Sequence, residues 1–262
     1  MDTARMTVGA PGRPLDRWWS LLFAVSGVAL LPWIVLLYLF QPAVAAVGNL
    51  ALAATGALAV LAVGLLVSAA LTLARSRYLA MISTATATLA LCAGFFHVVT
   101  GTADNPRAAA FATVVVVGPV AVLGILVARH GARPRRRGTD RLIAVLFVLG
   151  AVATVLAWVR AASMGFDAQY AHHLKIAWIA LDVAEAGALL LTAAALWQHP
   201  ARVPAAAAVT GTLLCSDVWF NVVGATGEAR TNAIQMAFVS IPLAVAALWV
   251  GVREIRQARQ AE

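Results

Sequence analysis

Acidic and amide side chains interrupt two of the apolar stretches in this sequence. Asp182 and Glu185 stand in one stretch. Asp217 and Asn221 stand in the next. A charged side chain at the centre of a hydrocarbon core costs roughly 2.5–3.5 kcal/mol on insertion scales, so acids found there face the protein interior and mark sites for ions, protons or substrates. These four residues therefore form the centre of the candidate site.

Their spacing places them on one face of each predicted helix. Lys175, Trp178 and Asp182 follow one another at intervals of three or four residues, with Glu185 three residues further on, and such intervals keep side chains on one face. If the sixth segment enters from the outside, Asp182 lies about 12 Å deep at 1.5 Å per residue, and Asp217 lies at a similar depth. We expect a cavity that opens to the outside and is lined by the three carboxylates.

Histidines extend this constellation. His97, in the third apolar segment, lies in the same outer half of the membrane, and His172 and His173 stand in the loop before the sixth segment. Imidazole and carboxylate groups suit zinc, iron or manganese, but the spacing matches no metal-binding signature such as HExxH. His172 and His173 are therefore only weak candidates for a metal site, and the sequence identifies no cofactor.

Structural roles for the same residues stay open. Asp217 and Asn221, at positions i and i+4, can act as hydrogen-bonding glue between membrane helices. His97 can equally fill a packing position, and the pair His172 and His173 can be a solvated part of the loop. The residue types alone do not separate these roles from binding.

The composition is that of a polytopic membrane protein. Hydrophobic residues make up 62% of the chain and charged residues 11%, against about a quarter charged in soluble domains. The net charge is +8, and the basic residues lie between the apolar segments. At such positions basic residues orient helices and face anionic lipid, so no nucleic-acid partner is predicted. Cys92 and Cys215 stand in separate segments without CxxC spacing, which indicates free thiols.

Eight apolar segments approach the roughly 20 residues that a helix needs to cross a bilayer. They cover residues 18–40, 50–74, 79–100, 109–128, 141–160, 174–197, 203–225 and 232–252. Fifteen of the 19 lysine and arginine residues lie at the two chain ends and in the even-numbered loops, which places both termini in the cytoplasm. We predict an all-α integral membrane protein with eight transmembrane helices.

An internal repeat relates the two halves of the chain at an offset of 124 residues. Asp16-Arg17 corresponds to Asp140-Arg141, Leu22-Phe23 to Leu146-Phe147, Val28-Ala29 to Val152-Ala153, Thr86 to Thr210 and Phe96 to Phe220. Each unit contains four segments, so both copies enter the membrane from the same side as parallel repeats. The predicted units are residues 1–128 and 141–262, joined by a basic cytoplasmic linker at 129–140.

The repeat assigns the acidic site to the second unit alone. Asp182 corresponds to Leu58, and Glu185 to Leu61. Asp217 corresponds to Ala93 in the same register. A simple scaffold has no need of this asymmetry, so we expect one site in each chain.

Three short stretches carry a resemblance to a known group. They are Leu31-Pro32-Trp33, Leu181-Asp182-Val183-Ala184-Glu185 and Asp217-Val218-Trp219-Phe220-Asn221. At these residues the chain resembles a group of uncharacterised actinobacterial multi-pass membrane proteins, over the first segment and the sixth to eighth. The resemblance implies a helical fold and a location in the bacterial plasma membrane, and it implies no function.

Three functions are compatible with these patterns. The first is a cation- or proton-coupled carrier of small solutes, or a binding sensor of that class, which predicts a water-accessible path. The second is an intramembrane enzyme acting on a lipid or isoprenoid through a protonated acid, which predicts an apolar pocket beside the acids. The third is a structural subunit of a membrane complex, which predicts acids engaged by arginine or backbone groups and no cavity.

Overall fold

The computed structural model describes residues 14–39, 45–100, 139–163 and 172–260. Within them the chain is helical, and the helices are α1 (Pro14–Leu39), α2 (Ala45–Leu73), α3 (Leu79–Thr100), α5 (Thr139–Ser163), α6 (His172–Gln198), the short 3-10 helix η1 (Pro200–Arg202), α7 (Val203–Gly224) and α8 (Gly227–Arg259). The predicted fourth segment, residues 109–128, and residues 129–138 of the predicted linker lie outside this part of the chain.

Five of these helices are long and apolar enough to cross a membrane by length and composition. They are α2, α3, α6, α7 and α8, while α1 and α5 contribute shorter apolar stretches at Trp18–Pro32 and Arg141–Leu156. In hydrocarbon every backbone polar group must be satisfied within the segment, and a helix of apolar residues meets that demand. The chain therefore has the architecture of a helical membrane protein.

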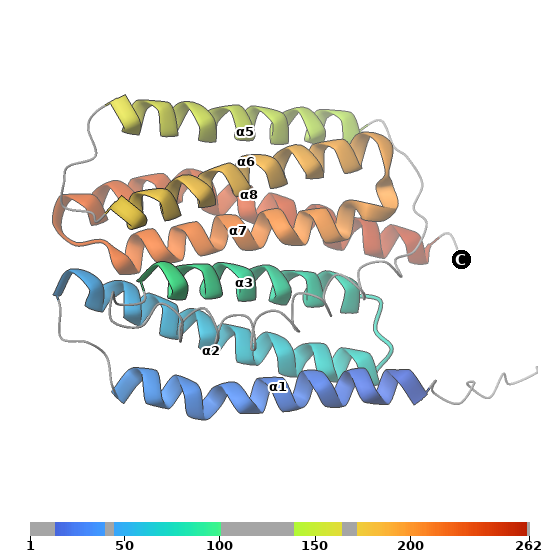
Figure 1. Ribbon diagram of the computed structural model, residues 1–262. Coiled ribbons are helices and arrows are strands. Elements are labelled where there is room, and N and C mark those ends of the chain that lie inside the picture. The colour runs from blue at the N-terminus through green and yellow to red at the C-terminus, as the bar shows by residue number, and fades with distance from the viewer. Residues whose placement is uncertain (1–13, 40–44, 101–138, 164–171, 261–262) are drawn as a thin grey trace, which may run out of the picture.

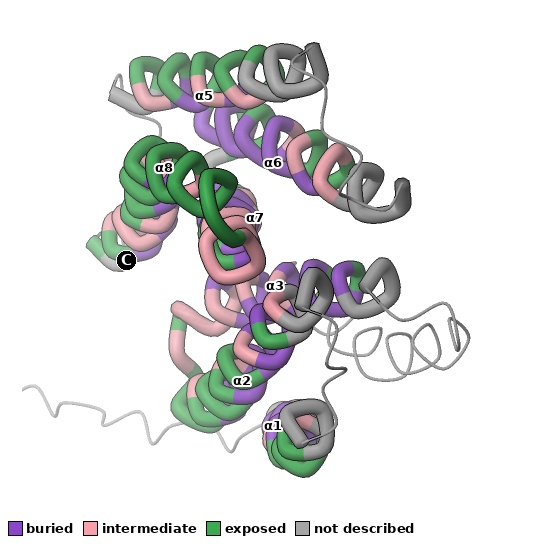
Figure 2. Tube along the Cα trace, turned by 90° about the vertical axis from the view of Figure 1, so that its left-hand side faces the viewer, coloured by how far each residue is buried: buried purple, intermediate pink, exposed green. Residues whose placement is uncertain are grey.

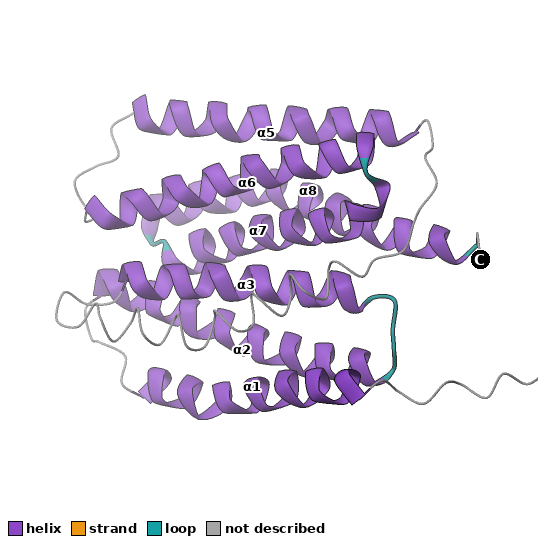
Figure 3. Cartoon of the chain, turned by 45° about the vertical axis from the view of Figure 1, so that its right-hand side comes forward, coloured by secondary structure: helices purple, strands orange, loops and turns teal. Residues whose placement is uncertain are grey.

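The helices lie roughly alongside one another, and α3 and α7 occupy the middle of the bundle (Figures 1 and 3). The order across the bundle is α1, α2, α3, α7, α6 and α5, with neighbours in contact at each step, and α8 packs against α7. Consequently the first three helices form one half, α5 to α8 form the other, and α3 meets α7 at the boundary.

Each half has its own apolar core. Phe23, Leu61 and Leu65 belong to the core of the first half, which also takes in side chains from α6 and α7. Phe147 and Leu189 belong to the core of the second half. Exposed residues cover the outward sides of α1, α2, α5 and α8, whereas buried residues gather on the central helices (Figure 2). Many exposed residues are large and apolar, as expected of a surface that faces lipid.

Glycine allows two helices from different halves to approach closely. Trp219 of α7 donates a hydrogen bond from Nε1 to the carbonyl oxygen of Ala53 in α2, at 2.8 Å. The same indole covers Gly56, where an added Cβ would come within 2.6 Å of Trp219 Cζ2. Small residues at such crossings are typical of helix packing in membranes, where close backbone approach replaces the hydrophobic effect.

The end of α8 reaches the start of α3. Met81, Ala208 and Ile255 form a small buried cluster that joins α3, α7 and α8. Just outside this cluster, the Arg256 guanidinium hydrogen-bonds the Tyr78 hydroxyl and lowers the pKa of that phenol. This contact closes the bundle at the end where α2 and α3 are joined.

The predicted segments match the helices closely, with two corrections. α8 begins at Gly227 and ends at Arg259, so it is longer at both ends than the predicted 232–252. The placement of His172 and His173 in a loop is wrong, because α6 begins at His172. In both cases a helix continues through polar residues beyond its apolar part, and apolar length alone does not predict that extension.

Candidate functional site

Three carboxylates from α6 and α7 approach one another in the middle of the bundle. Asp182 and Asp217 are half-buried, and Glu185 is buried at 3% exposure. The charge of Glu185 interacts with those of Asp217 and Asp182, and Asp217 also interacts with Asp182. The sequence-predicted acids are thus close enough to interact electrostatically, and their like charges repel when all three are ionised.

Glu185 lacks a hydrogen-bond partner at one oxygen. Its Oε1 atom is buried, and no donor within the described residues reaches it. Glu254 of α8 also has a buried oxygen without a partner, Oε2, but its Oε1 atom accepts a hydrogen bond from Arg253 Nη2 at 2.6 Å. A buried polar atom without a partner costs about 1–3 kcal/mol, so Glu185 occupies a position that packing alone does not favour.

Asp217 is oriented by its own helix. Asn221 donates a hydrogen bond from Nδ2 to Asp217 Oδ1 at 2.5 Å, one turn further along α7. Both side chains are half-buried. The amide therefore fixes one carboxylate oxygen of Asp217 and leaves the other for a different partner.

Buried hydroxyls fix α6 against α7 below the acids. The hydroxyls of Thr192 and Thr210 lie 2.8 Å apart and share a hydrogen bond, and both side chains are fully buried. Thr192 stands seven residues after Glu185, or about 10 Å along the helix axis. Two such anchored helices hold their acids at a constant separation.

Cys92 and Ser216, which the sequence did not single out for this site, lie next to Glu185. The Cys92 thiol of α3 approaches the Ser216 hydroxyl of α7 and also interacts electrostatically with Glu185. The Ser216 oxygen is buried and makes no hydrogen bond of good geometry with the described residues. In the sequence Ser216 is an ordinary small residue of an apolar helix, and only the packing of α3 against α7 shows that it lies beside Cys92.

Aromatic rings cover the site toward the ends of α3 and α7. Phe96 and Phe220 stack with ring centroids 4.0 Å apart and an interplanar angle of 14°. Trp178 packs its edge against Phe96, with centroids 5.1 Å apart. Trp178 was predicted on the face of the acids, and the structure places it beside this aromatic stack.

Four further predicted residues are placed only by their backbone. His97 lies in α3, and His172, His173 and Lys175 lie in the first turn of α6. Their side chains fall outside the described part of the structure. Among the described residues, no group of three or more histidine, cysteine, aspartate or glutamate side chains is arranged to hold a metal ion.

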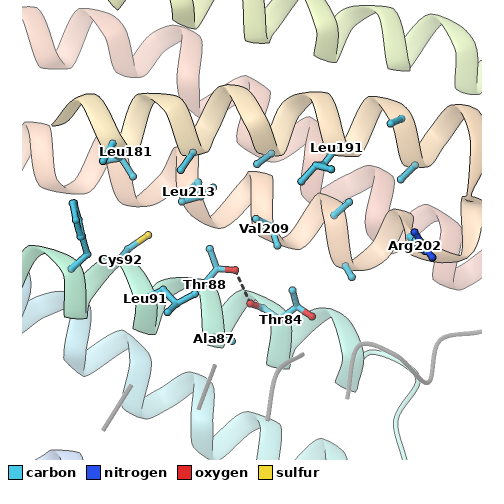
Figure 4. A pocket seen from close by; sticks show the side chains of 18 of the residues that line it. Thr84, Ala87, Thr88, Leu91, Cys92, Leu181, Leu191, Arg202, Val209 and Leu213 are labelled. Atoms are coloured by element: carbon cyan, nitrogen blue, oxygen red, sulfur yellow. Dashed lines mark hydrogen bonds between the residues drawn. The ribbon is translucent and has the colours of Figure 1, made fainter. Parts of the chain in front are cut away.

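A large cavity lies between α3, α6 and α7 (Figure 4). Its volume is about 1030 Å³, and it passes beside the acids at Leu181, Ala184, Cys92 and Ala188. The residues that line it include none of the three carboxylates. This cavity is therefore not the predicted one walled by carboxylates, because alanine and leucine side chains of α6 and α7 line it beside the acids.

Comparisons of the chain with family models, with curated proteins and with solved structures found no match.

Proposed function

We propose that the three carboxylates bind protons or a small organic cation, and that the protein is a cation- or proton-coupled carrier of small solutes. The observation that carries this proposal is Glu185, which is buried among apolar residues beside Asp182 and Asp217 with an unpartnered oxygen. Ionised groups in such a setting need a bound cation or proton to offset their burial and mutual repulsion. In a carrier, the transported cation or the coupling proton enters the site from solution and neutralises these charges.

We further propose eight membrane-spanning helices built from two parallel repeats, with both termini in the cytoplasm of a bacterial cell. Residues 124 positions apart have matching burial, which supports the repeat. Buried pairs are Phe23 with Phe147, Leu65 with Leu189, and Phe96 with Phe220. Exposed pairs are Leu22 with Leu146, and Val28 with Val152.

The contacts between α3 and α7 fit a pseudo-twofold axis at the centre of the bundle. Phe96 and Phe220 correspond in the repeat and stack directly on each other. Cys92 and Ser216 also correspond and lie side by side. Equivalent residues meet in this way only close to a symmetry axis, so the acids of the second unit stand near the axis with no counterpart in the first.

The two alternative functions account for less of the site. An intramembrane enzyme acting on a lipid would use the apolar cavity that passes beside the acids, but it also needs an acid at the wall of that cavity, and the described residues that line it include no carboxylate. A purely structural acid needs a partner such as the one that Arg253 gives Glu254. Glu185 Oε1 has no comparable partner among the described residues.

A binding experiment tests the proposal. Purified full-length protein is unfolded thermally in the presence of a panel of small organic ammonium ions and at several proton concentrations. A cation present at about 100 times its Kd should raise the free energy of unfolding by about 2.7 kcal/mol, and Glu185→Gln and Asp217→Asn should abolish that rise. The matched control is Glu228→Gln, at an exposed position in the first turn of α8. Equal responses in all three variants would contradict the proposal.

A further inference from the structure

The cavity between α3, α6 and α7 combines apolar walls with a basic end. Leu191, Val209 and Leu213 contribute to the walls. His199 and Arg202 line the same cavity where α6 ends and α7 begins. Both side chains are exposed, and within the described part of the chain no carboxylate pairs with Arg202.

The polar groups along the walls are already satisfied. Thr84 donates its hydroxyl hydrogen to the carbonyl oxygen of Ala80 at 2.7 Å. Thr88 donates its hydroxyl hydrogen to the carbonyl oxygen of Thr84 at 2.9 Å (Figure 4). These bonds turn the hydroxyl hydrogens back onto the α3 backbone. A ligand along the described walls therefore meets a largely apolar surface, and His199 and Arg202 offer charged or polar donors at one end.

The cavity reaches the surface of the described helices, where large exposed apolar side chains indicate contact with lipid. Leu191 is 66% exposed and Leu91 is 53% exposed, and both line it. Phe95 and Ala184 line it as well and are also exposed. A hydrocarbon chain can enter from this side without crossing water, whereas a small polar solute would have to cross hydrocarbon.

On the opposite side of α3 and α7, the corresponding space is filled. Trp219 packs over Gly56 between α7 and α2. In the register of 124 residues, Trp219 corresponds to Phe95 and Gly56 to Ala180, and these two line the cavity. The Phe95 ring is smaller than the Trp219 indole, so it fills less of the space between α3 and α6 than the indole fills between α7 and α2.

The dimensions suit a lipid chain. The lining runs from Ala205 to Leu213 on α7, from Thr84 to Phe96 on α3, and from Ala180 to His199 along and just beyond α6. At 1.5 Å per residue these spans are about 12, 18 and 28 Å long. One leaflet of a bilayer contributes about half of its roughly 30 Å of hydrocarbon, so the cavity is at least as long as one leaflet along α3 and α6. Its volume of about 1030 Å³ leaves room for a chain along this depth.

We propose that this cavity binds an anionic phospholipid, with an acyl chain between α3, α6 and α7 and the headgroup phosphate at Arg202 and His199. A guanidinium forms bidentate hydrogen bonds with phosphate, and the positive end of the α7 dipole adds to the attraction. The site is separate from the carboxylate cluster. Its lipid would fill the side of the bundle beside Cys92 and Ala188 and hold α3 against α6.

Lipid retention by the full-length protein tests the proposal. Wild type and variants are delipidated in detergent and titrated with phosphatidylglycerol or phosphatidylcholine of identical chains, and bound lipid is counted by native mass spectrometry. Arg202→Gln removes the headgroup contact, and Ala184→Trp fills the cavity. The matched controls are Arg141→Gln, an exposed arginine of α5 that does not line the cavity, and Ala246→Trp, an exposed alanine of α8. The thermal unfolding midpoint of each variant verifies folding.

Wild type should bind phosphatidylglycerol about fivefold more tightly than phosphatidylcholine, the factor expected from one arginine near an anionic headgroup. Arg202→Gln should lose that preference, Ala184→Trp should lose the tightest-bound lipid of either kind, and both controls should match wild type. Inorganic phosphate should not displace the lipid. The proposal would be overturned if Arg202→Gln and Arg141→Gln had the same preference for phosphatidylglycerol. It would also be overturned if folded Ala184→Trp retained as much lipid as wild type, or if inorganic phosphate displaced the lipid.

Discussion

Glu185 and Glu254 are both buried carboxylates, and they differ in their surroundings. Each has one buried oxygen without a partner among the described residues, but Arg253 engages the other oxygen of Glu254, whereas Glu185 faces two further acids. An acid that a fold requires is paired, because breaking a buried pair leaves a charge without compensation. Glu185 instead resembles an acid that is retained for a bound ion.

Replacing Glu185 with leucine should therefore stabilise the protein. Leu61 fills the corresponding position of the first unit and is fully buried. We expect Glu185→Leu to raise the free energy of unfolding by about 1–3 kcal/mol, because it removes a buried unpartnered oxygen. Chemical unfolding of variants in the same detergent measures the change.

Glu254→Leu is the matched comparison and should have the opposite effect. It removes the carboxylate that Arg253 contacts at 2.6 Å. The loss should lower the free energy of unfolding by about 3 kcal/mol. If both variants are destabilised to the same extent, Glu185 is a structural acid like Glu254.

At the scale of the helices, the contact between α3 and α7 positions the site. Cys92 lies next to Ser216, whereas the neighbouring Cys215 is exposed. We expect the double variant Cys215→Ala, Ser216→Cys to form a disulfide with Cys92 under mild oxidation, because the two side chains meet across the helix boundary. Mass spectrometry of proteolytic fragments detects the bond.

Wild type provides the control for this disulfide, since it has Cys92 and Cys215 but no cysteine at position 216. It should form no link between α3 and α7. A cross-linked wild type, or a double variant that stays reduced, would mean that α3 and α7 pack on different faces.

The crossing of α2 and α7 depends on Gly56. Gly56→Ala should lower the free energy of unfolding by about 1–3 kcal/mol, because its methyl group would come within 2.6 Å of Trp219 Cζ2. Trp219→Ala alone removes the ring and its hydrogen bond to Ala53. In the double variant the penalty of Gly56→Ala should vanish, and unfolding of all four proteins gives this coupling. Additive effects would show that the indole and Gly56 do not constrain each other.

Element boundaries were predictable from the sequence because apolar length determines where a helix can cross hydrocarbon. The prediction of residues 203–225 for α7 differs from the helix by one residue at its end. The polar ends of α8 were not predicted, because hydropathy indicates which residues can lie in lipid and does not indicate where a helix ends. The convergence of Asp182, Glu185 and Asp217 followed from their spacing and depth.

The cavity and the reach of Trp219 were not predictable in this way. Both depend on which faces of α2, α3, α6 and α7 contact one another and how closely. The periodicity of a single helix shows which of its faces is polar, but it does not show which neighbouring helix that face contacts. Ser216 likewise gains its importance from the neighbours that α3 and α6 bring to it.

The whole molecule should have both termini in the cytoplasm. We expect a cysteine introduced at Thr226, in the short loop between α7 and α8, to react with a membrane-impermeant thiol reagent added outside intact cells. A cysteine at His199, in the connection between α6 and α7, should react only after the membrane is permeabilised. If the labelling were reversed, the termini would lie outside the cytoplasm. If both introduced cysteines were labelled from the same side, α7 would not cross the membrane.

Proton movement in liposomes tests the central claim most directly. Full-length protein is reconstituted with a pH-sensitive dye in the lumen, and a panel of small organic ammonium ions is added outside under an imposed membrane potential. We predict that at least one of them changes the luminal pH with wild type. Glu185→Gln and Asp217→Asn should reduce the rate to that of empty liposomes, and Glu228→Gln should retain it. A wild type indistinguishable from empty liposomes, or acid variants as active as wild type, would contradict a proton- or cation-coupled carrier.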